Sequence, residues 1–327
     1  MPGEASSMER REALLRLLRA GGAAAGAAGA ALWLEGRSRR PEEAAAAVFR
    51  RNLSVPADAG HPDMAIVQGE DPGMLASRAV EELGGMGRFV SRGDRVVVKP
   101  NLSWDRTPAQ AANTNPEVVA EVVRLCLAAG AREVVVTDVS VHEPRRVFER
   151  SGVGPAARQA GAAVVLPAER LFKEVDLRGE VLRVWPVLEP FLTADKVINI
   201  PIAKHHSLTG ATLGMKNWYG ILGGQRQRLH QRIHESLADL AAFLRPTLTI
   251  LDAYRVLVRN GPTGGSLADV ELKKTVVASI DPVAVDAYAA QAFWGLGEDR
   301  LLYLKLAAAR GLGTPKFESL RVRNARV

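Results

Sequence analysis

Cysteine is almost absent from this chain, which has Cys126 alone among its 327 residues. A disulfide needs two thiols, and an iron–sulfur cluster or a four-cysteine zinc site needs several cysteine ligands. These residues cannot supply such a ligand set by themselves, so no iron–sulfur cluster is expected as a cofactor. Cys126 lies within an apolar helical pattern, which predicts a small core residue.

Aromatic residues and lysines are also scarce. Aromatics make up 5% of the chain and do not alternate with basic residues, so nucleic-acid binding is not expected. The net charge is +7, yet only 9 of the 43 basic residues are lysines. Three of the nine, Lys99, Lys204 and Lys216, lie in polar motifs. This placement predicts a specific need for an ammonium group there, and the positive balance favours a small anionic ligand.

Several common catalytic and nucleotide-binding motifs are missing as well. No Walker loop and no Rossmann glycine fingerprint follows a predicted strand, so ATP and NAD are not expected as cofactors. No Gly-x-Ser-x-Gly elbow occurs, which argues against a serine hydrolase of the usual α/β type.

The N-terminal residues have the pattern of a targeting segment. Arg10 and Arg11 precede an apolar run from Ala20 to Leu34, which is too short to span a membrane comfortably. Residues 1–34 are therefore predicted to be a twin-arginine-like signal or a membrane tether, giving an exported or membrane-tethered protein. The alternative is a basic amphipathic helix on a cytoplasmic protein. Residues 35–63, rich in Arg, Ala, Glu and Pro, are predicted to be a linker.

Residues 64–327 are predicted to form one α/β domain with a mixed, mainly parallel sheet flanked by helices. The segment from Arg95 to Thr137 predicts this fold, because it has the pattern of a strand, a helix and a second strand, with Asn115 as N-cap and Pro116 as first helical residue. Strands are predicted at 64–67, 95–99, 133–137, 163–166, 196–200, 247–251, 275–280 and 320–322, with a hairpin over 173–184. Helices are predicted at 72–83, 116–129, 145–150, 227–244, 283–294 and 301–310.

The richest polar stretch, 204–220, follows the predicted strand at 196–200 and is predicted to be a loop. It contains Lys204, His205, His206 and Lys216, which we predict to be catalytic. Lysines can bind an oxyanion, and histidines can titrate near neutrality or bind metal. The intervening glycines would let the chain fold back and bring both lysines to one ligand. The alternative is a glycine-rich surface loop with incidental charge.

Polar residues also follow other predicted strands. They are Lys99 with Asn101, Asp138, Asp252 and Asp281. The carboxyl ends of parallel strands share one edge, so these residues are expected to converge on one crevice with Lys204. Each aspartate has an alternative role as a helix or turn cap. His230 and His234 are expected on an exposed helix face.

The motifs occur in an order that resembles a known family. They are Val98–Lys99–Pro100–Asn101, Asn113–Thr114–Asn115–Pro116, Lys204–His205–His206 with Lys216–Asn217 and Gly220, Ile233–His234 with Asp239–Leu240, Asn260–Gly261–Pro262 with Gly264–Gly265, and Asp281–Pro282–Val283–Ala284–Val285–Asp286–Ala287. Over roughly residues 64–313 the chain resembles the bacterial and archaeal family called domain of unknown function 362. The resemblance agrees with a twin-arginine signal and implies no settled reaction. Many relatives carry ferredoxin-like cysteine motifs, from which this chain departs.

The leading hypothesis is an enzyme that acts on a small carboxylate or phosphate, with assistance from a divalent metal as an option. Substrate binding is assigned to Lys99, Asn101, Asn115, Thr209, Asn217, Asn260 and Gly261, and metal binding to Asp281, Asp286 and His205. The alternative is a solute-binding or cofactor-carrying accessory protein without turnover.

Overall fold

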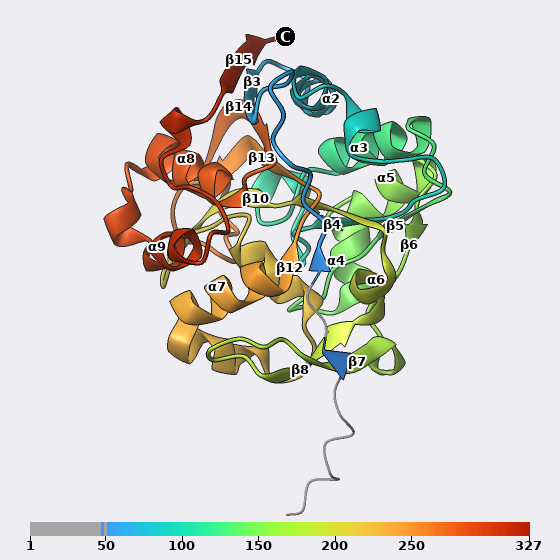
Figure 1. Ribbon diagram of the computed structural model, residues 1–327, viewed down its shortest axis with the longest axis vertical. Helices are drawn as coiled ribbons and strands as arrows, with labels where there is room; N and C mark the ends of the chain where they lie inside the picture. Colours follow the sequence, from blue (N-terminus) through green and yellow to red (C-terminus); the bar gives the residue numbers. More distant parts are fainter. Residues whose placement is uncertain (1–46, 49–50) are drawn as a thin grey trace, which may run out of the picture. The chain divides into compact units, whose positions relative to one another are not determined.

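The structure, a computed structural model, describes residues 47–48 and 51–327 (Figure 1). The predicted signal or tether at 1–34, and the linker up to residue 46, lie outside the described residues. Within the described part, no helix combines the length and the apolar character needed to cross a membrane.

A ten-stranded sheet forms the centre of the fold, and it is mixed and mainly parallel, as predicted. The order along its main path is β15-β3-β14-β13-β9-β4-β5-β6, and β10 joins through β13 and pairs with β11. β14 runs antiparallel to both its neighbours, and β11 runs antiparallel to β10. The strands are β3 (Met64–Gln68), β4 (Arg95–Pro100), β5 (Glu133–Val136), β6 (Ala163–Val164), β9 (Lys196–Ile200), β10 (Ile202–His206), β11 (Gly210–Thr212), β13 (Leu248–Leu257), β14 (Val270–Ser279) and β15 (Val322–Arg326).

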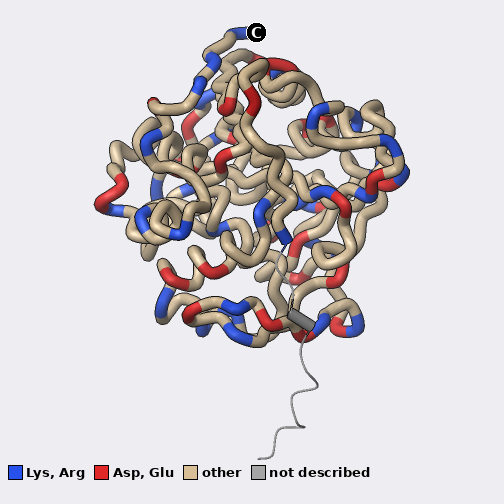
Figure 2. Tube along the Cα trace, viewed as in Figure 1, with Lys and Arg blue, Asp and Glu red and all other residues tan. Residues whose placement is uncertain are grey.

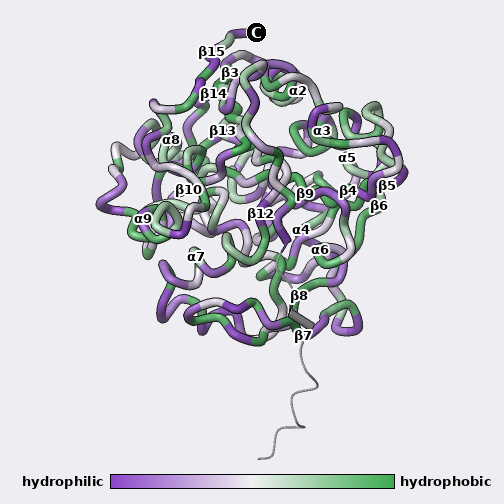
Figure 3. Tube along the Cα trace, in the orientation of Figure 1, coloured by the Kyte–Doolittle hydropathy of each residue, from purple (hydrophilic) through white to green (hydrophobic). Residues whose placement is uncertain are grey.

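Helices cover both faces of this sheet. One layer contains α2 (Pro72–Glu82), α3 (Pro116–Ala128), α4 (Pro144–Arg150) and α5 (Val153–Gln159), and the other contains α7 (Ile233–Phe243), α8 (Pro282–Trp294) and α9 (Leu302–Ala309) (Figure 1). Strand β4 shows why two layers are needed: Val96 and Val98 pack into one hydrophobic cluster, and Val97 packs into the other. Successive side chains of a strand point to opposite faces, so an all-valine run requires cover on both. Figure 3 shows the hydrophobic residues concentrated in the strands and the inner helix faces.

Several elements differ from their predictions, three of them near the polar residues singled out in the sequence. The helix expected from residue 227 begins at Ile233, because residues 226–232 form 3-10 turns. Strand β13 continues to Leu257 rather than ending before Asp252. The stretch 204–220, expected to be a loop, contains strands β10 and β11 and a 3-10 helix, Lys216–Ile221.

Part of the expected linker is held against the domain. β1 (Ala47–Val48) pairs with β7 (Phe172–Asp176), and β2 (Arg51–Asn52) pairs with β12 (Leu244–Arg245). Further along, Arg88 forms an ion pair with Asp58 at 2.9 Å. These contacts attach the segment before Met64 at several points.

The predicted hairpin is present as β7 and β8 (Val184–Leu188), followed by α6 (Glu189–Thr193). Its tip depends on Asp239 of α7, which is 1% exposed. The Asp239 carboxylate accepts hydrogen bonds from the backbone N–H groups of residues 180, 181 and 182 at 2.8–3.0 Å. It also pairs with Arg310 at 2.8 Å. One buried carboxylate therefore joins the hairpin, α7 and the end of α9.

We expect Asp239→Ala to lower the free energy of unfolding by about 2–4 kcal/mol, because it leaves three backbone N–H donors unpaired and removes one of the two carboxylate partners of Arg310. Urea unfolding followed by circular dichroism measures this loss. The control is Glu174→Ala on the exposed side of β7, expected within about 0.5 kcal/mol of wild type. Equal stability of the two variants would contradict the role given to Asp239.

Candidate functional site

A buried ion pair lies where β4 and β5 end. The Lys99 ammonium contacts Asp138 Oδ1 at 2.7 Å, and both side chains are at most 1% exposed. Asp138 Oδ2 accepts a hydrogen bond from the backbone N–H of Leu102 at 2.6 Å. Burial lowers the pKa of Lys99 and raises the pKa of Asp138, while their mutual attraction opposes both changes.

Lys99 has no hydrogen left for a ligand. Besides Asp138 it donates to Pro100 O at 2.9 Å and to Asn217 Oδ1 at 3.0 Å. An ammonium group has three N–H donors, so all are used. Asn217 in turn accepts from Asn101 Nδ2 at 2.9 Å and donates to Asn199 Oδ1 at 2.8 Å. Lys99, Asn101 and Asn217, predicted as ligand-binding residues, thus form one buried network.

Gly220 is required beside this network. A Cβ atom at this position would lie 1.8 Å from Asp138 Oδ1 and 2.7 Å from Lys99 Nζ. The Gly220 carbonyl accepts a hydrogen bond from Val139 N at 2.8 Å, which holds its backbone against the end of β5. No side chain fits in that contact.

Strand β10 separates the two adjacent histidines. Neighbouring residues of a strand face opposite sides, so Lys204 and His206 share one face and His205 takes the other. Lys204 donates to Asn101 Oδ1 at 2.8 Å and to Ala112 O at 2.6 Å. His205 Nδ1 accepts from Gly261 N at 3.1 Å. His205 therefore holds the loop at 261 against β10, away from the residues that surround Lys204.

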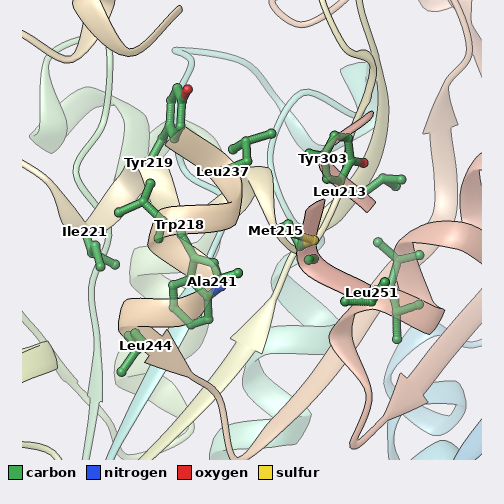
Figure 4. Close-up of a cluster of buried hydrophobic side chains, with 14 of the residues drawn as sticks. Leu213, Met215, Trp218, Tyr219, Ile221, Leu237, Ala241, Leu244, Leu251 and Tyr303 are labelled. Atoms are coloured by element: carbon green, nitrogen blue, oxygen red, sulfur yellow. The ribbon is translucent and has the colours of Figure 1, made fainter. Parts of the chain in front are cut away.

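Lys216 is placed by an apolar anchor. Met215 and Trp218, on either side of Lys216 and Asn217, are fully buried in a cluster with Leu237 and Ala241 of α7 (Figure 4). The Lys216 ammonium lies 4.4 Å from the centroid of the Tyr219 ring. Over the residues that the structure describes, it has no hydrogen-bond or carboxylate partner, although the residue is only 8% exposed.

Arg226, which was not predicted to be a site residue, is a further cation of the site. Its guanidinium donates to the carbonyl oxygens of Val139 and Ser140 at 2.7 Å and of Tyr219 at 3.2 Å. Arginine is the common cation of this chain, so nothing in the composition distinguished it. His230, expected on an exposed face, stacks on His206 at 6.2 Å between ring centroids.

Lys204, His206, Lys216, Arg226 and His230 are among the residues that line a cavity of about 430 Å³. Lys204, Lys216 and Arg226 supply positive charge, and Asp138 is the carboxylate among its lining residues. Because Asp138 is already paired with Lys99, the three cationic groups that face the cavity have no carboxylate of their own within residues 51–327. Two further lining residues, Trp104 and Thr212, carry buried polar atoms, Nε1 and Oγ1, with no hydrogen-bond partner in the described chain.

The excess of positive charge is found around the cavity rather than over the whole surface. Figure 2 shows positive and negative residues interspersed over the outer helices and loops. Around the cavity, burial and nearby positive charge instead lower the pKa of basic groups. Burial, then Lys216, lowers the pKa of Lys204 to about 7. Burial, then Arg226, lowers the pKa of Lys216 to about 7, and burial lowers the pKa of His206 to about 2. An anion in the cavity would relieve this repulsion.

Other predicted binding residues support the site from outside. Asn115 caps α3 by accepting from Glu117 N at 2.9 Å, and Thr209 donates to Ala211 O at 2.8 Å within the β10–β11 turn. Asn260 donates to Asp269 Oδ2 at 3.0 Å. Gly261 is packed so closely that a Cβ atom would lie 2.1 Å from His205 O. These contacts position loops around the cavity, and none of the four residues lines it.

The expectation that Asp281 shares the edge of the sheet with Lys99 and Lys204 is wrong. Asp281 follows β14, which runs antiparallel to β13, so it lies at the opposite end of the sheet. There it caps α8, accepting from Val283 N and Ala284 N at 2.9 Å. Asp286 accepts from Gly214 N at 2.7 Å and Met215 N at 3.0 Å, and burial raises its pKa to about 7.

The metal hypothesis for His205, Asp281 and Asp286 stays a prediction. The two carboxylates are occupied by backbone N–H groups, and His205 lies on β10 facing the loop at 261. Across residues 47–48 and 51–327, no group of three or more His, Cys, Asp or Glu side chains is arranged to hold a metal ion.

The fold and site together define an α/β protein with a buried cationic cavity at the carboxyl ends of parallel strands. Residues 96–291 match the family model described as "Domain of unknown function (DUF362)". The chain belongs to this family, which confirms the resemblance inferred from its motifs.

Two individual proteins show similarity to this chain, one in sequence and one in structure. The thylakoid-associated protein sll1697 of Synechocystis sp. is 30% identical over an alignment of 238 residues, and the match covers 66% of this chain and 73% of that protein. Among solved structures, the lactate racemase apoprotein of Thermoanaerobacterium thermosaccharolyticum superposes with a TM-score of 0.42 at 11% identity. That match covers 76% of this chain and 61% of the racemase.

We expect Gly220→Ala to cost about 3–5 kcal/mol of stability, because the added methyl group separates Lys99 from Asp138 and leaves buried charges unpaired. Chemical denaturation of the purified chain measures the loss. Gly87→Ala is the matched control, since a Cβ at residue 87 meets nothing within 4 Å. A Gly220→Ala protein as stable as the Gly87→Ala protein would contradict the close contact.

Lys216→Met should raise the stability of the ligand-free protein at pH 6.5 by about 2 kcal/mol or more, and the gain should vanish near pH 10.5. The folded state lowers the pKa of Lys216 from 10.5 to about 7, so the unfolded chain binds its proton more strongly. Below pH 7 the folded protein carries the full penalty, and above pH 10.5 both states are neutral. Urea unfolding of both proteins between pH 6.5 and pH 10.5 measures how the stability difference changes with pH. A stability gain that grows with pH would contradict the lowered pKa of Lys216.

Proposed function

We propose that this protein is an enzyme that binds a small carboxylate or phosphate in the cavity and transfers a proton to or from it. The single observation that carries the proposal is the charge of the cavity: among the described residues, three cationic groups line it, and the one carboxylate, Asp138, is paired with Lys99. Isolated buried cations are costly, so such a set is typical of a site completed by an anion.

The lysines differ in how many hydrogens they can offer. Lys99 donates all three to the protein, Lys204 donates two, and Lys216 donates none to described residues. Lys204 is fixed in place with one N–H remaining, which suits it to hold the anionic group. Arg226 is fixed by three carbonyl oxygens and adds charge.

Lys216 is the group best suited to proton transfer. A general acid or base works best when its pKa lies near the pH of the reaction, and burial brings the pKa of Lys216 to about 7. His206 and His230 face the same cavity, and burial lowers the pKa of both, so they serve as neutral rings near neutral pH.

Glycolate is a suitable probe of binding, because its charge is constant near neutral pH. We expect isothermal titration calorimetry to show glycolate binding that Lys204→Met weakens about tenfold or more through loss of a charge-assisted contact. Lys316→Met removes the same charge from an exposed position and should leave the affinity unchanged. Equal weakening by both variants would indicate unspecific attraction and contradict the site.

Turnover separates an enzyme from a binding protein. Small carboxylates that bind are incubated with the protein in deuterated water, and exchange of their carbon-bound hydrogens is followed by proton NMR. Exchange that Lys216→Met abolishes is the expected result. Binding without exchange would favour the non-catalytic accessory protein instead.

A further inference from the structure

Lys216 is unusual among the basic residues of the cavity, because the residue is only 8% exposed and its amine has no acceptor among the described residues. Both neighbouring cations donate hydrogen bonds to the protein: Lys204 to Asn101 Oδ1 and Ala112 O, and Arg226 to three carbonyl oxygens. A lysine that only supported the structure would be expected to share in such bonds. Lys216 instead lines the cavity over the ring of Tyr219.

We propose that Lys216 forms a reversible imine with a small anionic substrate that carries an aldehyde or ketone group, such as a 2-oxo acid. The inference rests on the proposed function, because the cavity must first bind the anionic group. It extends that function by naming the substrate class and by making Lys216 a nucleophile.

The reaction balances with Lys216 and solvent. The neutral Lys216 amine attacks the carbonyl carbon, a C–N bond forms as the C=O π bond breaks, and one N–H proton moves to the former carbonyl oxygen to give a carbinolamine. The carbinolamine C–O bond then breaks, its hydroxyl takes a proton from solvent, and water leaves. The product is a protonated imine at Lys216, while Lys204 keeps its remaining N–H on the anionic group of the substrate.

Three features of the cavity suit this chemistry. A lysine desolvated beside another cation is a stronger nucleophile at neutral pH, and burial and Arg226 place Lys216 in this situation. The Tyr219 ring, 4.4 Å from Nζ, can stabilise the positive charge of the protonated imine. Thr212 Oγ1, buried and without a partner in the described chain, can hydrogen-bond the substrate oxygen.

The test is reductive trapping of the full chain with glyoxylate, which carries an aldehyde beside a carboxylate. Sodium cyanoborohydride reduces the imine to a stable amine, and intact mass followed by peptide mapping locates it. We expect a single adduct at Lys216, formed at least tenfold faster than at the other lysines. Its rate should rise between pH 6 and pH 8 as the amine loses its proton.

Matched controls separate this reaction from general lysine modification. Lys216→Arg should remove the adduct, and Lys204→Met should slow labelling about tenfold at low glyoxylate. Acetaldehyde, which lacks the carboxylate, should show a preference for Lys216 over the exposed lysines that is at least tenfold smaller than that of glyoxylate, and glycolate should protect Lys216 from glyoxylate by competition. The wild-type peptide map remains decisive even where a variant fails to fold.

The outcomes distinguish the imine from the binding site on which it depends. If glycolate binds through Lys204 but glyoxylate labels lysines at random, the imine is overturned and anion binding stands. If neither compound binds to the folded protein, both proposals are overturned. Labelling of Lys216 that is equally fast with acetaldehyde would also overturn the assigned substrate class.

Discussion

The ion pair between Lys99 and Asp138 is the contact on which the site depends. It joins the ends of β4 and β5, fixes Asn217 through a third hydrogen bond and requires glycine at residue 220. The pair also determines the charge of the cavity. Because Lys99 neutralises the carboxylate that lines the cavity, the part of the chain that the structure describes offers the remaining cations no other carboxylate there. A structural interaction thereby creates the electrostatic demand for an anion.

Much of the fold could be predicted because local signals agreed with the tertiary structure. Valine-rich runs correctly predicted β4 and β5. Asn115, as the N-cap, and Pro116, as the first helical residue, correctly predicted the start of α3. Part of the site could be predicted for the same reason. Lys99, Lys204 and Lys216 stood out in a chain that otherwise uses arginine, and the structure brings them within one network and cavity.

The features of the fold and site that could not be predicted depend on contacts between residues that are far apart in the sequence. Whether β14 runs parallel or antiparallel is decided by its pairing with β3 and β13, so the sequence could not show that Asp281 would lie at the opposite end of the sheet. His205 and His206 diverge because residues 202–206 join the sheet as a strand. Arg226 was missed since only its carbonyl partners, distant in sequence, distinguish it from other arginines.

The sheet order has a consequence for how the protein is made. β3, at residues 64–68, lies between β14 and β15, so both its partners come from the last sixty residues of the chain. During synthesis, this apolar strand therefore remains unpaired until almost the whole domain has left the ribosome. Pairing between strands that are far apart in the sequence slows folding, and an unpaired apolar strand can aggregate in the meantime. The domain should therefore rely on chaperones during translation more than its local helix–strand units would suggest.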